Sequence, residues 1–175
     1  MIATLDEWQA ARAHLDAVVA ELGAAGISSS RRLEIGIMVE VPAAALRIAD
    51  FAAEVDFFSI GSNDLGQYLF AAERGNASVA ALGDSYQPAL LGLIGDIVRD
   101  AHQAGRPVAL CGELAGDLAL VPILVGLGLD ELSVHPVAIT TVARAIRRTS
   151  GGEAARLAET VRGFTSARTV RARLK

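Results

Sequence analysis

The stretch FFSIGSNDLGQY, residues 57–68, decides the fold because it joins an apolar strand directly to three polar side chains. Residues 57–61 are fit to be buried on both faces of a sheet, which is typical of strands in parallel sheets. Ser62, Asn63 and Asp64 follow at once, and a hydrophobic core would not tolerate them. Taken alone, Asn63 or Asp64 is best interpreted as the N-cap of the next helix. Capping explains one of these side chains and not two.

The same alternation of strand and helix runs through the rest of the chain. Continuous apolar segments predict strands at residues 33–39, 55–61, 106–113 and 130–136. Helical patterns predict helices at residues 4–26, 42–54, 64–75, 87–105, 117–128 and 139–150, followed by an Ala- and Arg-rich helical tail. Apolar strands separated by helices indicate a parallel sheet that is covered on both faces.

Local features refine this outline. Residues 4–26 place a row of apolar side chains on one helical face, namely Trp8, Ala11, Leu15, Val18, Val19 and Leu22. Pro122 would remove a hydrogen bond inside its helix, so we expect a kink or a late helix start there. Residues 1–3 are the candidate end of a fifth strand. Ser28–Ser30 and Gly151–Gly152 are expected to be loops.

Composition excludes several classes of protein. The chain has 175 residues, 52% of them hydrophobic, which is enough for one sizeable core. The net charge is only -4 and the Lys and Arg residues are scattered except near the C-terminus, so neither a nucleic-acid partner nor a membrane surface is expected. One cysteine excludes an internal disulfide and a multi-cysteine zinc site. The N-terminus lacks a signal-peptide pattern, and we expect a cytoplasmic protein.

Polar or reactive residues follow three of the predicted strands at the corresponding position. Ligands of parallel α/β folds bind at the carboxyl ends of the strands, where the loops converge. The residues concerned are Glu40, then Ser62, Asn63 and Asp64, then Cys111, Gly112 and Glu113. Two carboxylates on neighbouring strands can share one Mg²⁺ ion and leave room for a substrate phosphate. Arg74 could reach that phosphate, and the Cys111 thiol could donate a proton to a substrate carbon.

Each of these residues has a simpler interpretation when it is taken alone. Glu40 could accept hydrogen bonds from backbone donors at the start of the next helix. Cys111 could be a small core residue, and Arg74 could be a solvated surface arginine. The combination of the residues, rather than any one of them, favours a site.

At these residues the sequence resembles the phosphoenolpyruvate-utilising enzymes, and within them Enzyme I of the sugar phosphotransferase system. The resemblance lies in four blocks in the family's order: GIMVEVPAA at 36–44, VDFFSIGSNDLGQYLFAAERGN at 55–76, LCGELAGD at 110–117 and GLGLDELSV at 126–134. It implies an α/β fold, the C-terminal half of a (β/α)8 barrel of the phosphoenolpyruvate/pyruvate type. Residues 1–150 would form this partial barrel, and residues 151–175 a helical tail.

The resemblance also implies a role for each candidate residue. Glu40 and Asp64 match the Mg²⁺ ligands, and Cys111 matches the catalytic proton donor that protonates the enolate as pyruvate forms. The residues that would bind phosphoenolpyruvate are Asn63, Asp64, Arg74, Gly112 and Glu113.

The similar enzymes pass the phosphoryl group to a histidine on a separate N-terminal domain, and from there to a histidine-containing phosphocarrier protein. The family's TSH motif around that histidine and the phosphate-binding arginines of its earlier strands have no counterpart in this sequence. We therefore expect the chain to be inactive alone. A half barrel exposes two strand edges and one side of its core, so we expect a homodimer or pairing with the missing half.

Two other functions remain open at this point. The chain could be a non-catalytic module that senses phosphoenolpyruvate or pyruvate with Mg²⁺. It could also be a Mg²⁺-dependent carbon–carbon lyase of the same barrel group, although the SNDLGQY, ERGN and CGE blocks argue against a lyase.

Overall fold

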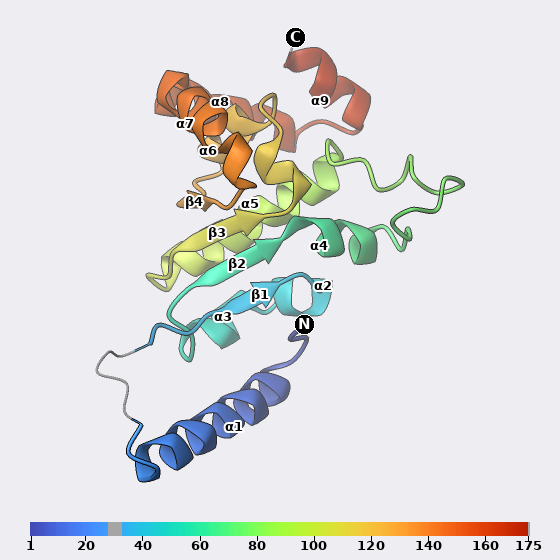
Figure 1. Cartoon of the computed structure of the whole chain (residues 1–175). Coiled ribbons are helices and arrows are strands. Elements are labelled where there is room, and N and C mark those ends of the chain that lie inside the picture. The colour runs from blue at the N-terminus through green and yellow to red at the C-terminus, as the bar shows by residue number, and fades with distance from the viewer. Residues whose placement is uncertain (28–32, 175) are drawn as a thin grey trace.

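A four-stranded parallel sheet forms the centre of the computed structural model, which describes residues 1–27 and 33–174. The strands lie in the order in which they occur in the chain (Figure 1). They are β1 (Ile37–Val39), β2 (Phe58–Gly61), β3 (Val108–Cys111) and β4 (Glu131–Leu132). The predicted α/β class and the parallel sheet are confirmed. Over residues 1–27 and 33–174 the sheet stays open and does not close into a barrel.

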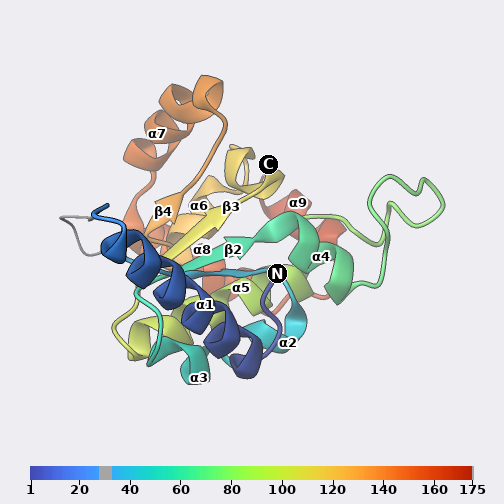
Figure 2. The same cartoon turned by 60° about the horizontal axis from the view of Figure 1, so that its bottom comes forward.

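Helices connect the strands and continue beyond β4. They are α1 (Leu5–Ala24), α2 (Pro42–Ala45), α3 (Ile48–Ala52), α4 (Ser62–Leu69), α5 (Pro88–Gln103), η1 (Glu113–Gly116), α6 (Val121–Gly126), η2 (Pro136–Ala138), α7 (Ile139–Arg148), α8 (Gly151–Arg162) and α9 (Ala167–Arg173). The loop at residues 70–87, between α4 and α5, extends away from the sheet in both views (Figure 1, Figure 2). No helix within the described ranges is both long enough and apolar enough to cross a bilayer.

The core lies against one face of the sheet. Alternate side chains of β1, β2 and β3 are at most 3% exposed, namely Ile37, Val39, Phe58, Ile60, Val108 and Leu110. On the other face Met38 is 39% exposed and Cys111 is half-buried. The expectation that both faces are covered is therefore wrong for the described residues, whereas the expected exposed side of a half barrel is present.

Several predicted elements have different bounds in the structure. The helix predicted at 42–54 is divided into α2 and α3. Residues 1–3 form no strand, Gly151 and Gly152 begin α8 rather than a loop, and Ser28–Ser30 lie outside the described residues. Pro122 is in the first turn of α6, so the expected late start is confirmed. Proline is tolerated there because the first-turn amides have no partner within the helix.

Helix α4 ends six residues before the predicted bound of 75 because the backbone reverses at Ala71. Ala71 has a φ of 49°, in the left-handed region, and the Ala72 amide donates to the Gln67 carbonyl at 3.0 Å. This is the hydrogen bond of a Schellman motif, which terminates a helix. The chain therefore leaves α4 before Arg74, and Arg74 belongs to the 70–87 loop.

Helix α1 packs at the β1 edge of the sheet through its N-terminal half (Figure 1). Thr4 and Glu7 form a capping box that fixes the start of the helix. Trp8 is 5% exposed, but Val18, Val19 and Leu22 are exposed. The predicted buried face of this helix is therefore buried only near Trp8.

Helices α6 and α8 pack closely because Gly126 has no side chain. A Cβ atom on Gly126 would lie 2.0 Å from the carbonyl oxygen of Ala154 in α8. The contact brings the backbones of the two helices together and attaches the C-terminal helices to the sheet layer.

We predict that Gly126→Ala destabilises the protein even though alanine favours helix formation. The new methyl group would overlap backbone, so α6 and α8 must separate, at a cost of about 1–3 kcal/mol in the free energy of unfolding. Urea unfolding measures this change. Gly92→Ala in α5 is the matched control, because no atom lies within 4 Å of its Cβ position. Equal stability of the two variants would contradict the described packing of α6 on α8.

Candidate functional site

The candidate site lies around the junction between β2 and α4. Helix α4 starts at Ser62 with Gly61 as its N-cap residue, and no side chain caps it. The interpretation of Asn63 or Asp64 as the N-cap is therefore wrong, because both lie inside the first turn. The Oδ1 atom of Asn63 instead accepts a hydrogen bond from the Glu113 amide at 3.1 Å. Asn63 thus connects the end of β2 to the turn after β3.

A second hydrogen bond joins the same two strand ends. The Ser62 hydroxyl donates to the carbonyl oxygen of Cys111 at 2.6 Å, and Ser62 is 4% exposed. Gly112 makes this approach possible, since a Cβ atom there would lie 2.4 Å from the Ser62 Oγ. Gly112 also has a φ of 96°, which favours glycine. The predicted residue Gly112 therefore has a clear structural role.

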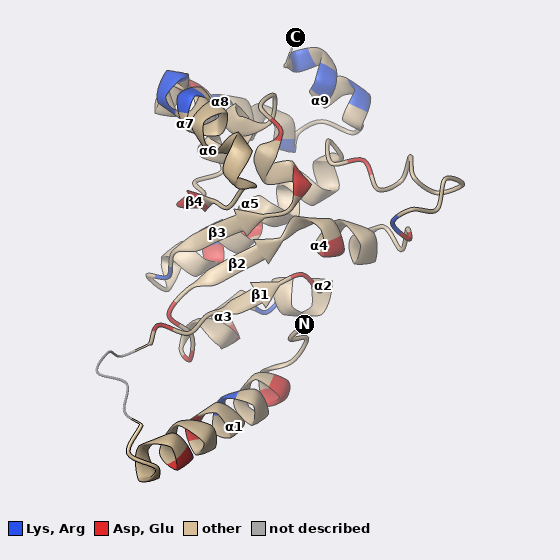
Figure 3. Ribbon diagram, in the orientation of Figure 1, with Lys and Arg blue, Asp and Glu red and all other residues tan. Residues whose placement is uncertain are grey.

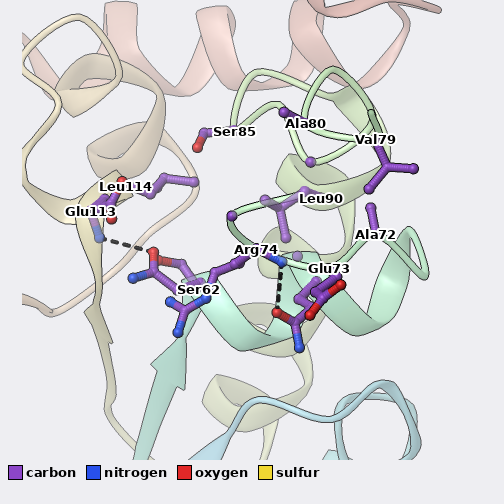
Figure 4. A pocket seen from close by; sticks show the side chains of 15 residues that line it. Ser62, Ala72, Glu73, Arg74, Val79, Ala80, Ser85, Leu90, Glu113 and Leu114 are labelled. Carbon is purple, nitrogen blue, oxygen red and sulfur yellow. Dashed lines mark hydrogen bonds between the residues drawn. The ribbon is translucent and has the colours of Figure 1, made fainter. Parts of the chain in front are cut away.

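A pocket of about 280 Å³ opens between α4, the 70–87 loop and η1. Three predicted site residues line it: Asn63, Arg74 and Glu113. Figure 4 shows Glu113 and Leu114 on one side of the pocket, with Ala72 and Val79 on the other. The lining combines one guanidinium with carboxylate, amide and hydroxyl groups, a polar set suited to a small charged ligand.

Arg74 connects this pocket to Asp64. Its Nη2 atom lies 3.5 Å from the Asp64 Oδ1, and the two side chains are 53% and 36% exposed. Such an exposed pair contributes little to stability. The Arg74 amide donates to the Gln67 Oε1 at 3.0 Å, which holds the loop against α4. Sequence reasoning missed Gln67, although it follows Asn63 by four residues and thus shares its helical face.

Glu40 and Cys111 form a separate group around Gly61. The Cys111 Sγ lies 3.8 Å from the Met38 Sδ, and these residues belong to β3 and β1. Their side chains meet across β2 because Gly61 has none: a Cβ atom there would lie 3.3 Å from the Met38 Sδ and 2.9 Å from the Glu40 Oε2. Glu40 is largely covered, at 15% exposure of its side chain. Met38 and Gly61 were not predicted to shape the site.

The predicted residues therefore form two neighbouring groups rather than one cavity. Asn63, Arg74 and Glu113 line the pocket, and Asp64 touches it through Arg74. Glu40 and Cys111 lie outside the pocket lining, by Gly61. The two groups meet where β2 passes into α4.

The carboxylates provide oxygen donors that suit a hard cation. Among the described residues no three His, Cys, Asp or Glu side chains are grouped as a complete metal site. Mg²⁺ does not need such a cage, because it is usually held by one or two carboxylates with waters and substrate phosphates. Acidic residues occur at the loops after β1 and β3 and at the start of α4 (Figure 3). Glu40 and Asp64 thus fit Mg²⁺ in type and number.

The chain belongs to the family of PEP-utilising enzymes, where PEP is phosphoenolpyruvate. The sequence profile of the family's PEP-binding domain matches residues 1–150. This finding agrees with the open parallel sheet and with the polar residues at its carboxyl end. The resemblance noted in the sequence is thereby confirmed.

Similar proteins carry the name phosphoenolpyruvate-protein phosphotransferase. The protein of that name from Geobacillus stearothermophilus is 46% identical over 170 residues, which are 97% of this chain and 29% of the relative. The one from Haloferax volcanii is 48% identical over 161 residues, 92% of this chain and 28% of the relative. The chain thus spans less than a third of the length of these relatives.

We predict that Ser62→Ala loosens the junction of the two strand ends. The variant loses a buried hydrogen bond and leaves the Cys111 carbonyl without this donor, which costs about 1–2 kcal/mol in the free energy of unfolding. Urea unfolding followed by circular dichroism measures the loss. Ser78→Ala, in the exposed part of the 70–87 loop, is the control and should unfold like the wild type. A Ser62→Ala variant of wild-type stability would show that this bond contributes nothing.

Proposed function

We propose that the carboxyl ends of β1, β2 and β3 bind phosphoenolpyruvate with Mg²⁺ for phosphoryl transfer to a protein histidine. The observation that carries this proposal is the pocket lined by Asn63, Arg74 and Glu113 beside Asp64, in a chain of the PEP-utilising family. Phosphoenolpyruvate carries a phosphate and a carboxylate, so a guanidinium and amide donors complement it.

Asn63 and Arg74 supply donors for the phosphate. Because the Asn63 Oδ1 accepts a hydrogen bond from the Glu113 amide, the Asn63 Nδ2 is left to donate a hydrogen bond to a phosphate oxygen. The Arg74 guanidinium can form two parallel hydrogen bonds to a phosphate. In the free protein Arg74 faces Asp64. Substrate binding would exchange these partners, bringing Arg74 to the phosphate and releasing Asp64.

Glu40 and Asp64 would hold the Mg²⁺ ion. When bound, Mg²⁺ stabilises negative charge on the transferring phosphoryl group and on the enolate oxygen that it leaves. Gly61 matters for this role, because any side chain there would collide with Glu40.

Cys111 is the proposed proton donor. As the bond between phosphorus and the enol oxygen breaks, the phosphoryl group passes to a histidine nitrogen and the substrate is left as the enolate of pyruvate. The Cys111 thiol then gives its proton to C3 of the enolate, which yields pyruvate and a thiolate. Cys111 is half-buried on the less covered face of the sheet, next to the Met38 thioether.

The accepting histidine, the phosphocarrier protein and a second subunit or barrel half are the proposed partners. We assign the substrate-binding role to residues 1–150 and treat residues 151–175 as a helical tail. The purified 175-residue chain should then bind substrate without phosphorylating the carrier.

Titration calorimetry with phosphoenolpyruvate tests the substrate-binding role. We expect the wild type to bind in the presence of Mg²⁺ and to bind much more weakly in its absence. Arg74→Gln should weaken binding roughly tenfold or more, because a charge-assisted hydrogen bond to phosphate is lost. Cys111→Ala should retain wild-type affinity, because the thiol acts after the phosphoryl group has left.

The matched control is Arg47→Gln. Arg47 also pairs with an aspartate, Asp50, but it is exposed and lies outside the pocket lining. Its removal should leave the affinity for phosphoenolpyruvate unchanged. If Arg74→Gln and Arg47→Gln bind with equal affinity, Arg74 is not a phosphate ligand and the proposal fails.

A further inference from the structure

The last part of the 70–87 loop, the limb at 83–86, contacts the C-terminal helix α9. The guanidinium of Arg171 pairs with both carboxylate oxygens of Asp84, and its Nη2 lies 2.9 Å from the Asp84 Oδ1. The same guanidinium lies over the Tyr86 ring, 4.0 Å from the ring centroid. Arg171 thus combines a two-pronged ion pair with a cation–π contact, although 87 residues separate it from Asp84.

Tyr86 extends this connection to the segment that follows η1. Its hydroxyl donates to the Asp117 Oδ2 at 2.6 Å, and the Asp117 Oδ1 accepts from the Ala119 amide at 3.0 Å. Burial, the hydrogen bond to Asp117 and its negative charge raise the pKa of Tyr86 to about 12. The phenol therefore remains a hydrogen-bond donor at neutral pH.

The Arg171–Asp84 pair differs from an ordinary surface ion pair. Partial burial alone would raise the pKa of Asp84, but hydrogen bonds from Arg171 and the Tyr86 amide and the charge of Arg171 hold this pKa below its ordinary value. The Asp84 side chain is only 20% exposed. Exposed single-contact pairs contribute little, whereas a bidentate pair within a network can fix local geometry.

These contacts hold two walls of the candidate pocket. Gly83 and Ser85, beside Asp84, line the pocket on the loop side. Glu113 and Leu114 line it on the η1 side, three or more residues before Asp117. Most of residues 73–83 are exposed, so this part of the loop has few core contacts to position it. The clamp of Arg171, Asp84, Tyr86 and Asp117 is therefore where α9 can fix the loop relative to η1.

We propose that Arg171 is a positioning residue that holds the loop limb at 83–86 in place and thereby sets the affinity of the pocket for phosphoenolpyruvate. The ligand part rests on the proposed function, and the positioning part does not. Arg171 lies outside the pocket lining and contacts Asp84 and Tyr86, so it acts on the pocket through these two residues. The C-terminal tail, which lies outside the region matched by the family profile, thus becomes part of the site.

Arg171→Gln in the full chain tests this role by hydrogen exchange without ligand and by calorimetry with phosphoenolpyruvate and Mg²⁺. We expect faster exchange of amides at 77–87 and unchanged exchange in β2 and β3. If the binding-competent loop falls to about a fifth of the population, the dissociation constant rises roughly five-fold. Arg171→Lys keeps the positive charge over Tyr86. Its amide exchange rate and its dissociation constant should therefore lie between those of Arg171→Gln and the wild type.

Arg168→Gln is the matched control, because Arg168 is exposed on the same helix. It should behave like the wild type in both measurements. Wild-type exchange at 77–87 in Arg171→Gln overturns the positioning role. If Arg171→Gln shows faster exchange at 77–87 but binds phosphoenolpyruvate with wild-type affinity, the proposed effect of Arg171 on ligand binding is overturned. A wild type that binds no phosphoenolpyruvate contradicts the proposed function instead, and the exchange result still decides whether Arg171 positions the loop.

Discussion

The hydrogen bond from the Ser62 hydroxyl to the Cys111 carbonyl is the contact on which the rest of the site depends. It joins the carboxyl ends of β2 and β3 at a point where Gly112 lets the two backbones approach. The bond between Asn63 and the Glu113 amide follows from the same approach. Together they place α4 beside η1, and the pocket exists because the 70–87 loop then closes the third side.

Much of the fold could be predicted because it follows from local patterns. Continuous apolar segments indicated the four strands, and the polar residues after three of them indicated the candidate site at one edge of the sheet. The end of α4 at Leu69 could not be predicted, because a non-glycine residue, Ala71, adopts the left-handed conformation. The clamp between Arg171 and Asp84 has no sequence motif and joins segments that are far apart along the chain, so only the structure could reveal it.

In the proposed function, the chemical tasks are divided between two sides of the β2–α4 junction. The donors that we propose for phosphate lie in the pocket, and the Cys111 thiol lies by Gly61 on the less covered face of the sheet. The two proposed metal ligands lie one on each side: Asp64 contacts Arg74 of the pocket, and Glu40 packs against Gly61. Phosphoryl transfer and enolate protonation occur at different atoms of phosphoenolpyruvate, so this division suits the proposed chemistry. The glycines at 61 and 112 are what allow the groups to approach.

We propose that the carboxyl ends of these strands form one site for a divalent cation and phosphoenolpyruvate. A crystal structure of the full chain with Mn²⁺ in place of Mg²⁺ and with phosphoenolpyruvate tests it most directly, because anomalous scattering locates the metal independently. We expect an anomalous peak in contact with carboxylate oxygens of both Glu40 and Asp64, with the phosphate at Arg74 and Asn63. A metal held elsewhere, or a phosphate bound away from Arg74, would contradict it.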